Sequence, residues 1–323
     1  MPRNPFEGVK LPPEVEAFIS SLLSRIRKVG GTTIKDRELR RLALYRDSLK
    51  VYEDFVRSVP SIDGLHPFYR TALELIAGDL ERVKVCLGAV SRGVRLARKV
   101  VLQYMKEIRA NEEDQANALM RAGFGRASSI LRRRAECVSY LRKVFAEARK
   151  LMAIDPDLPT IIVAGPPNVG KSTLVSRIST AKPEVASYPF TTKEIHVGHI
   201  RTDWGLIQVI DTPGILDRPM EERNVIEKKA INAIVNLKGV IVFMFDVSTG
   251  ALYSAEEQIS LFEEVSGLKP TVPVLNKVDV QDEGLRKLVE DYLKGKGVRF
   301  FTISAEKGEG VEELVKFLLE SVK

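Results

Sequence analysis

The sequence lacks the features that mark membrane-spanning, secreted and disordered proteins. No apolar run approaches the roughly 20 residues that a membrane-spanning helix needs, and the N-terminus contains no apolar core of a signal peptide. Hydrophobic residues make up 44% of the chain and charged residues 29%, without an excess of proline or glycine. These proportions indicate an intracellular, folded protein, and 323 residues allow two domains of ordinary size.

Residues that form disulfides or metal clusters are also scarce. The two cysteines, Cys86 and Cys137, lie far apart in segments with helical patterns, so neither a disulfide framework nor a metal-binding spacing is expected. His196 and His199 lie three residues apart on a predicted strand, where their side chains face opposite sides. They are not expected to hold one metal ion together, and structural or surface roles are predicted for them.

Charge is unevenly placed along the chain. Residues 1–150 contain 30 lysines and arginines against 18 aspartates and glutamates, an excess of +12, whereas the rest has 20 against 25. The net charge of +7 therefore arises entirely in the N-terminal part. Such asymmetry is expected when one domain meets a polyanion and the other has a different role.

The N-terminal half has the pattern of helices. Over residues 12–152 the apolar positions recur at three- and four-residue spacing, and Thr33 is a suitable N-cap. Two of the apolar stripes are Leu42, Tyr45, Leu49, Tyr52 and Val56, and Val138, Leu141, Phe145, Ala148 and Met152. Breaks at residues 60–64 and 66–67 separate long helices. We expect an all-α bundle of roughly antiparallel helices over residues 1–154.

The C-terminal half follows a different pattern. The segment Asp155–Pro159 contains two prolines, cannot continue a helix and is the expected linker. After it, helical stretches alternate with short β-rich runs at Ile161–Val163, Leu206–Ile210, Val240–Phe245, Val272–Leu275 and Val298–Ile303. This alternation predicts an α/β domain over residues 160–323, with a mostly parallel sheet and helices on both faces.

One loop of this domain fits the pattern of a phosphate-binding loop. The run GPPNVGKS starts at Gly165, follows a predicted strand and opens a predicted helix, which is the context that the pattern requires. Glycines let the backbone curl so that its amides and the positive end of the helix point at phosphates. Lys171 would bridge the β and γ phosphates, and the Ser172 hydroxyl would bind Mg²⁺. The residues expected to contact nucleotide here are Gly165, Pro166, Pro167, Asn168, Val169, Gly170, Lys171, Ser172 and Thr173.

Two further segments are predicted to surround the γ-phosphate. Asp211, at the expected carboxyl end of a strand, can hold Mg²⁺ directly or through water. The Gly214 amide of the same Asp-Thr-Pro-Gly turn can reach the γ-phosphate and sense its presence. Upstream, the loop of residues 188–193 carries two hydroxyls that can close over this phosphate. Thr192 is favoured as the Mg²⁺ ligand of this loop, with Thr191 as the alternative.

The run Asn276-Lys-Val-Asp279 follows another apolar strand and predicts which base is bound. Guanine carries hydrogens on N1 and N2 along one edge, and the Asp279 carboxylate can accept both, whereas adenine offers no such donor pair. A site built around buried hydrogen bonds rejects a ligand that leaves them unmade. Asn276 would tie this loop to the phosphate-binding loop, and the stem of Lys277 would cover the base.

Ser304, Ala305 and Glu306 fit the last loop that contacts the base, with the Ala305 amide meeting the guanine oxygen. Four motifs thus occur in the order and strand-end context of a GTP-binding domain. Hydrolysis is expected to be slow, because Ile215 stands where signalling G proteins carry the glutamine that orients the attacking water. The residues expected to act in GTP hydrolysis are Lys171, Thr192 and Gly214.

The sequence resembles the nucleolar GTP-binding protein family of large-ribosomal-subunit assembly factors, a branch related to the Obg GTPases. Besides the generic motifs, the stretches PFTTKEIHVGHI, DTPGILDRPMEERN and LHPFY are similar to family hallmarks. The resemblance covers nearly the whole chain and corresponds to a short form without the C-terminal extension of longer members. It implies a factor, cytoplasmic or, in a eukaryote, nucleolar, whose helical domain contacts ribosomal RNA. A monomer without membrane association is expected.

The charge split favours the same RNA contact. The basic residues predicted to face phosphates are Arg132, Arg133, Arg134, Arg142, Lys143, Arg149 and Lys150. Asn168 resembles the phosphate-loop asparagine that binds K⁺ in some related GTPases, so Mg²⁺ and K⁺ are the implied cofactors. The alternative reading is a signalling-type switch whose helical bundle docks a protein partner.

Overall fold

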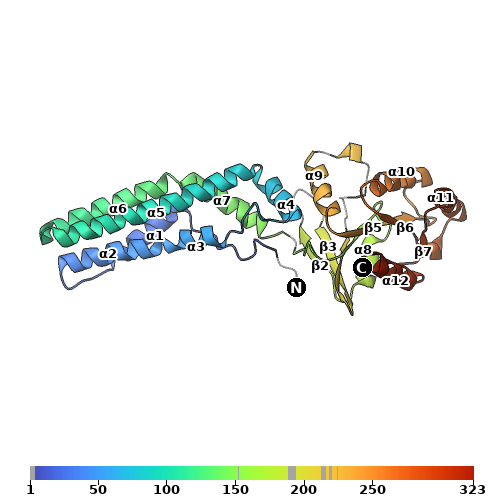
Figure 1. Ribbon diagram of the computed structural model, residues 1–323, viewed down its shortest axis with the longest axis horizontal. Coiled ribbons are helices and arrows are strands. Elements are labelled where there is room, and N and C mark those ends of the chain that lie inside the picture. Colours follow the sequence, from blue (N-terminus) through green and yellow to red (C-terminus); the bar gives the residue numbers. More distant parts are fainter. Residues whose placement is uncertain (1–3, 152, 188–193, 212–215, 218–219, 224) are drawn as a thin grey trace. The chain divides into compact units, whose positions relative to one another are not determined.

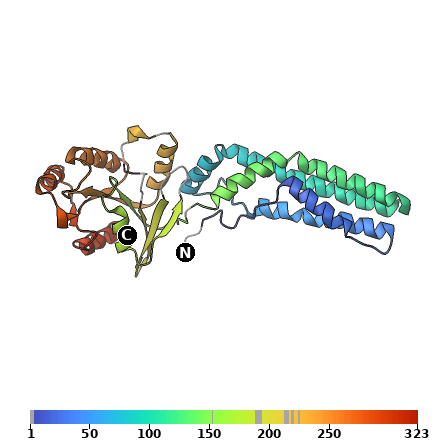
Figure 2. The same cartoon turned by 180° about the vertical axis from the view of Figure 1, so that it is seen from behind.

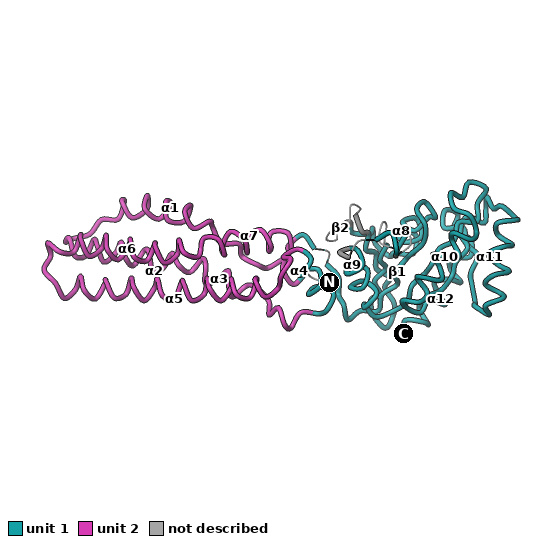
Figure 3. Tube along the Cα trace, turned by 90° about the horizontal axis from the view of Figure 1, so that it is seen from above, with its two compact units in different colours: residues 1–4, 66–75, 150–323 teal, residues 5–65, 76–149 magenta. Residues whose placement is uncertain are grey.

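The structure, a computed structural model, describes residues 4–151, 153–187, 194–211, 216–217, 220–223 and 225–323 (Figure 1). Its contacts group into two compact units, coloured separately in Figure 3. The helical unit comprises residues 5–65 and 76–149, and the α/β unit comprises residues 1–4, 66–75 and 150–323.

The helical unit is built from long helices that pack along one another (Figures 1 and 2). Its helices are α1 (Val15–Arg27), α2 (Ile34–Ser48), α3 (Lys50–Ser58), α5 (Leu80–Ala110), the short η1 (Glu113–Gln115), α6 (Ala116–Arg132) and α7 (Ala135–Ala148). Helix α5 packs along α6, and α2 packs against both. The Thr33 side chain accepts a hydrogen bond from the Asp36 amide at 3.0 Å, which confirms the predicted N-cap of α2.

The first apolar stripe differs from the prediction at its last position. Leu42, Tyr45, Leu49 and Tyr52 are buried, as the spacing predicts, but Val56 is only half-buried and Phe55 takes the core position instead. Leu49 separates α2 from α3, and the short helix α3 faces the core with Tyr52 and Phe55. Of the second stripe, Met152 lies outside the described residues, and the other four members are buried.

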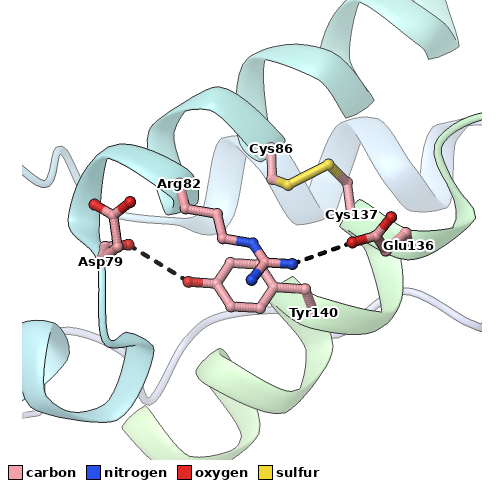
Figure 4. Close-up of a disulfide and its surroundings, with 6 residues drawn as sticks. All are labelled: Asp79, Arg82, Cys86, Glu136, Cys137 and Tyr140. Carbon is pink, nitrogen blue, oxygen red and sulfur yellow. Dashed lines mark hydrogen bonds and ion pairs between the residues drawn. A yellow bond between two sulfur atoms is a disulfide. The ribbon is translucent and has the colours of Figure 1, made fainter.

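The prediction that the cysteines stay unpaired is wrong. Cys86 of α5 and Cys137 of α7 form a disulfide, with their Cα atoms 5.1 Å apart (Figure 4). Their separation of 51 residues gave no sign of pairing, because the chain runs away from Cys86 along α5 and returns beside it through α6 and α7. Arg82 and Tyr140 lie next to the disulfide, and the Arg82 guanidinium is 4.4 Å from the centre of the Tyr140 ring.

Helix α4 (Pro67–Ala77) has most of its contacts with the α/β unit. The Tyr69 hydroxyl donates to the Ile154 carbonyl at 2.7 Å and accepts from the Ile154 amide at 2.9 Å. Lys229 forms an ion pair with Glu74 of α4 at 2.8 Å. Residues 66–75 therefore belong by contact to the α/β unit, whereas the sequence boundary at residue 154 placed them with the helical domain.

Within the described residues the α/β unit contains a seven-stranded sheet with strand order β2-β3-β4-β1-β5-β6-β7. The strands are β1 (Thr160–Ala164), β2 (Glu184–Ser187), β3 (Glu194–Thr202), β4 (Gly205–Asp211), β5 (Gly239–Asp246), β6 (Thr271–Asn276) and β7 (Phe301–Ile303). The helices are α8 (Lys171–Ile178), η2 (Met220–Glu222), α9 (Val225–Val235), α10 (Ala255–Ser266), η3 (Val278–Val280), α11 (Glu283–Gly295) and α12 (Val311–Ser321). Strand β7 starts three residues later than Val298, the predicted start.

The sheet is mostly parallel, as predicted, with β2 and β3 as an antiparallel edge. One face packs under α8 and α12, where Leu174 and Leu314 are fully buried against the strands. On the other face, Phe243 and Phe245 of β5 pack against Phe262 of α10. Residues 160–164 are buried throughout, which explains why this strand reads as an uninterrupted apolar run.

The parallel register brings the ends of five strands to one edge of the sheet. Asp211 of β4 aligns with Val163 of β1, and Asp246 of β5 aligns with Asn276 of β6, which aligns in turn with Ile303 of β7. Open α/β sheets bind ligands at this edge. No helix in the described part of the chain is long and apolar enough to cross a membrane.

Candidate functional site

The loop from Gly165 to Gly170 connects β1 to α8 and depends on its two glycines. Their φ angles are 134° and 100°, in the region that favours glycine. A Cβ atom at Gly165 would lie 2.4 Å from the Met244 carbonyl oxygen, and one at Gly170 would lie 2.4 Å from the Asn276 amide nitrogen. The loop is therefore closely packed against β5 and β6, and neither position has room for a side chain.

Lys171 places a buried positive charge in this loop. Its ammonium group donates to the carbonyl oxygens of Gly165 at 2.8 Å and Pro166 at 2.7 Å. A pocket of about 360 Å³ opens beside it, at the N-terminal end of α8, where backbone amides and the helix dipole favour anions. Its lining residues are Pro167, Asn168, Gly170, Lys171, Ser172, Thr173 and Asp217. This arrangement suits a phosphate chain.

Asp211 has the geometry expected of a Mg²⁺ ligand. The carboxylate is fully buried at the end of β4, and its Oδ2 atom accepts a hydrogen bond from the Ser172 hydroxyl. Its Oδ1 atom has no hydrogen-bond partner among the described residues. Carboxylate and hydroxyl oxygens are the ligands that Mg²⁺ prefers, together with water and substrate phosphates. Ser172 and Asp211 therefore fit the metal predicted for them.

His196 is a neighbour of this site that the sequence did not reveal. Its Nδ1 atom lies 3.4 Å from Oδ2 of Asp211, because β3 pairs His196 with Asp211 in antiparallel register. His199, three residues further along the same strand, is half-buried, and burial lowers its pKa below the usual value. That the two rings do not hold one metal ion together stays a prediction. One sign of the contact between His196 and Asp211 was present in the sequence, because the strand that contains His196 directly precedes the strand that ends in Asp211.

Asn276 joins the loops around the base. Its amide nitrogen donates to the Val169 carbonyl at 2.7 Å, which confirms the predicted tie to the phosphate-binding loop. Its Oδ1 atom accepts a hydrogen bond from the Ala305 amide at 2.8 Å. The expected role of that amide, meeting the guanine oxygen, is therefore not what the structure shows, since Asn276 already takes its hydrogen.

Asp279 lies in a second pocket that adjoins the first. The Ser304 hydroxyl lowers the pKa of this carboxyl below its usual value, and Lys307 acts in the same direction, so the group is ionised near neutral pH. The pocket has a volume of about 320 Å³ and is lined by Asn168, Gly170, Thr173, Asn276, Lys277, Asp279, Val280, Ser304, Ala305 and Glu306. Three lining residues are shared with the phosphate pocket, so the two form one continuous site.

Two residues that hold the base pocket in place were not predicted from the sequence. Asp246, at the end of β5, accepts a hydrogen bond from the Lys277 ammonium group at 2.6 Å and so holds its stem near the base pocket. Arg177 of α8 donates to the carbonyl oxygens of Ala305 and Glu306, which fixes the last loop. The signal for Asp246 was available, because it follows an apolar strand as Asp211 does.

The residues predicted to act on the γ-phosphate have a divided outcome. Lys171 lines the phosphate pocket, and its contact with the β and γ phosphates stays a prediction. Thr191 and its rival Thr192, the loop amide of Gly214 and the neighbouring Ile215 lie outside the described residues.

The basic residues predicted to face RNA fall into three groups. Arg132 forms an ion pair with Glu16 at 2.8 Å, and Arg142 forms one with Glu14 at 2.9 Å. Arg134 is half-buried and packs its stem beside Gly93 of α5. The remaining four, Arg133, Lys143, Arg149 and Lys150, are exposed. Part of the predicted positive surface is therefore already neutralised within the helical unit.

Known protein families account for both parts of the chain. Residues 6–155 match the family model described as NOG1 N-terminal helical domain, and residues 160–277 match the one described as 50S ribosome-binding GTPase. The chain belongs to the nucleolar GTP-binding protein 1 family. The predicted fold class, a helical domain followed by a P-loop GTPase domain, is confirmed. Neither description mentions the Obg GTPases, so that relation stays an expectation.

Several relatives carry the same family name. Nucleolar GTP-binding protein 1 of Drosophila melanogaster is 32% identical over 96% of this chain and 50% of that protein. The Saccharomyces cerevisiae protein of that name is 34% identical over 81% of this chain and 42% of its own length. A solved structure of a candidate nucleolar GTP-binding protein 1 from Plasmodium falciparum is 35% identical, covering 53% of this chain and 90% of that one, with TM-score 0.47. The chain spans about half the length of the curated relatives it matches.

Proposed function

We propose that the protein is a slow GTPase that acts in assembly of the large ribosomal subunit, with its helical domain contacting ribosomal RNA. The observation that carries the nucleotide part is the continuous site in which Lys171, Ser172 and Asp279 occupy two adjoining pockets. The names of the relatives and the positive excess of residues 1–150 support the ribosomal part. The proposed location is the cytoplasm, or the nucleolus in a eukaryote.

Guanine selection follows from the ionised carboxylate of Asp279. The carboxylate accepts hydrogen bonds from N1 and N2 of guanine, and Lys277, anchored on Asp246, covers the face of the base. A nucleotide without this donor pair would leave Asp279 without its two partners inside the pocket. Hydrogen bonds to charged groups contribute about 1.5–3 kcal/mol each, so two of them distinguish strongly between bases.

Phosphate binding and metal binding share the remaining residues. Lys171 turns from the loop carbonyls toward the β and γ phosphates, and the amides of residues 168–173 bind the phosphate oxygens. Mg²⁺, held through Ser172 and Asp211, would neutralise charge that develops on the phosphate oxygens. Thr192 and Gly214 are proposed to complete the site around the γ-phosphate. Asn168 is proposed to bind K⁺, and equal turnover in sodium and potassium would contradict this role.

The low rate of hydrolysis is part of the proposal. Ile215 offers no group that orients water, so turnover depends on phosphate positioning until a partner supplies more. Single-turnover phosphate release from GTP measures the intrinsic rate, and addition of large ribosomal subunits tests for stimulation. A fast intrinsic rate without subunits would contradict the proposal.

The ribosomal part is tested by cosedimentation with large ribosomal subunits, in the GTP-analogue and GDP states and at two salt concentrations. We expect association that is stronger in the GTP-analogue state and weakens steeply with salt, because phosphate contacts release counterions. Absence of association in both states would overturn the ribosomal assignment and leave the nucleotide site intact. Association without salt dependence would favour a bundle that docks a protein partner.

A further inference from the structure

The positive excess of the N-terminal half comes from two short stretches. Residues 82–106 contain seven lysines and arginines and residues 115–135 contain five, and neither stretch contains an aspartate or glutamate. The remaining residues of 1–150 hold 18 basic and 18 acidic side chains and are neutral as a group. The whole excess of +12 is therefore confined to these two stretches.

The two stretches form neighbouring helices. Residues 82–106 lie within α5, and residues 115–135 cover α6 and its ends. The helices pack along each other in the helical unit, and both views show them side by side (Figures 1 and 2). Confining twelve basic residues to one helix pair concentrates the positive potential on one part of this unit.

Some of these twelve residues are already neutralised. Arg82 pairs with Glu136 beside the disulfide (Figure 4), and Lys84 pairs with Asp63 and Glu81. Arg98 pairs with Glu53 of α3, and Arg132 pairs with Glu16 of α1. These four residues stabilise contacts between helices or turns and are not the residues most open to a partner.

Seven others are exposed and have no ion pair in the helical unit, all of whose residues the structure describes. We call them the cationic face: Arg92, Arg95, Lys99, Lys106, Arg121, Arg126 and Arg133. The four members on α5 are spaced three, four and seven residues apart, so they share one side of that helix. Arg126 of α6 is 5.5 Å from the centre of the Tyr104 ring of α5, which places it at the seam between the helices.

The α6 part of the cationic face leaves room for a ligand to approach the helix backbone closely. Its other exposed positions include Ala118, Ala122, Gly125 and Ser129, which recur every three or four residues along the helix. A Cβ atom added at Gly125 would meet nothing within 4 Å. A polyanion could thus lie near the α6 backbone with arginines on both sides, which suits a phosphate chain better than a bulky side-chain surface does.

We propose that the cationic face on α5 and α6 binds the phosphate backbone of RNA. This inference rests on the proposed RNA contact and moves it away from Lys143, Arg149 and Lys150, which lie on α7 and just after it. Arginine is well suited to the task, because its planar guanidinium donates two parallel hydrogen bonds to a phosphate. The face is built for backbone contacts, so it reads RNA shape and not base sequence.

Two triple variants of the full chain test the placement. The α5 variant, with Arg92→Gln, Arg95→Gln and Lys99→Gln, removes three charges from the cationic face. The α7 variant, with Lys143→Gln, Arg149→Gln and Lys150→Gln, removes three from α7 and its C-terminal end. Binding to a short RNA duplex is measured by fluorescence anisotropy over a range of salt concentrations. The α5 variant should bind roughly tenfold or more weakly, with a salt slope smaller by about one for each phosphate that is no longer neutralised. The α7 variant should bind nearly as the unmodified chain does.

The outcomes distinguish the location of the RNA-binding surface from RNA binding by the helical domain as such. Loss of binding in the α7 variant, with little loss in the α5 variant, would overturn the cationic face while RNA binding by the helical domain stands. Absence of RNA binding by the unmodified chain would contradict the proposed RNA contact itself. Displacement of the duplex by poly-L-glutamate at equal charge concentration would instead assign the face to an acidic protein. Unchanged helix content by circular dichroism is required of both variants.

Discussion

The two units of the protein use their charged side chains in opposite ways. In the α/β unit, Lys171 and Asp211 are buried at one sheet edge, where Lys171 donates to carbonyl oxygens of its own loop and Asp211 accepts from the Ser172 hydroxyl. In the helical unit, the cationic face is exposed, and its seven members have no carboxylate partner. A buried charge must be held in place or it destabilises the fold, whereas an exposed charge needs no partner to be tolerated.

The difference teaches what kind of ligand each unit suits. Buried groups that are enclosed by the fold favour a small ligand of defined shape, because only such a ligand fits the space around them. Exposed, flexible cations favour a polyanion, whose affinity depends on the number of charges neutralised. The predictions below test whether the two units can be perturbed separately.

The largest effect is expected from opening the Cys86–Cys137 disulfide, which joins residues 51 positions apart in the helical unit. A crosslink over such a loop stabilises by about 4 kcal/mol in the chain-entropy description. Cys137→Ser, or reduction of the unmodified chain, should lower the melting temperature of the helical unit without changing GTP affinity. Calorimetry with and without reductant measures the shift, and thiol alkylation with mass spectrometry reports the bond. Equal melting with the bond open and closed would contradict this prediction.

The next largest effect concerns the base pocket. Asp279→Ala removes the carboxylate that accepts two hydrogens from guanine, and GTP affinity should fall roughly 100-fold or more. Isothermal titration with GTP and ATP measures the affinity and the preference. Asp282→Ala is a matched control, because this carboxylate caps α11 by accepting from the Leu285 amide and does not line the pocket. Retained preference for GTP in the Asp279 variant would show that guanine is recognised elsewhere.

A smaller effect should reveal which unit contains α4. Tyr69→Phe removes a buried hydroxyl with two hydrogen bonds to Ile154 and should destabilise the α/β unit by about 1–3 kcal/mol. Tyr140→Phe is the matched control in the helical unit, where the hydroxyl donates to the Ala77 carbonyl. Hydrogen exchange of strand β1 should increase in the first variant and not in the second. The reverse result would place α4 with the helical unit.

The smallest effect is a pH dependence from His199. Burial lowers its pKa in the folded state, so the unfolded chain binds more protons as the pH falls below about 6.5. Stability of the α/β unit should therefore decrease from neutral pH downward until the folded pKa is passed. His199→Gln should make the denaturation midpoint less sensitive over that range. An unchanged pH profile in the variant would assign the dependence to other groups.

The sequence predicted that the residues of the candidate nucleotide site lie together, because their chemistry is tied to local spacing. Asp211, Asn276 and Ser304 each follow an apolar strand, and parallel strands necessarily end at one sheet edge. The same logic would have found Asp246, which occupies the equivalent place on β5. The hydrogen bond from the Ala305 amide to Asn276 could not be predicted from the sequence, since it depends on the relative positions of two loops.

Sequence reasoning was weaker where partners come from distant helices. The ion pair of Arg132 with Glu16 joins residues 116 positions apart, and no spacing rule predicts it. The Cys86–Cys137 bond and the Tyr69 contact with Ile154 have the same origin, the packing of elements that are remote in sequence. A count of charges along the chain located the excess, but the structure was needed to separate paired from unpaired residues.

The most direct test of the account measures GTP affinity and RNA affinity on the same two proteins. We expect Asp279→Ala to lose GTP binding and keep the RNA affinity of the unmodified chain. The variant with Arg92, Arg95 and Lys99 changed to glutamine should lose RNA binding and keep its GTP affinity. If either variant lost both activities while remaining folded, the assignment of one ligand to each unit would be wrong.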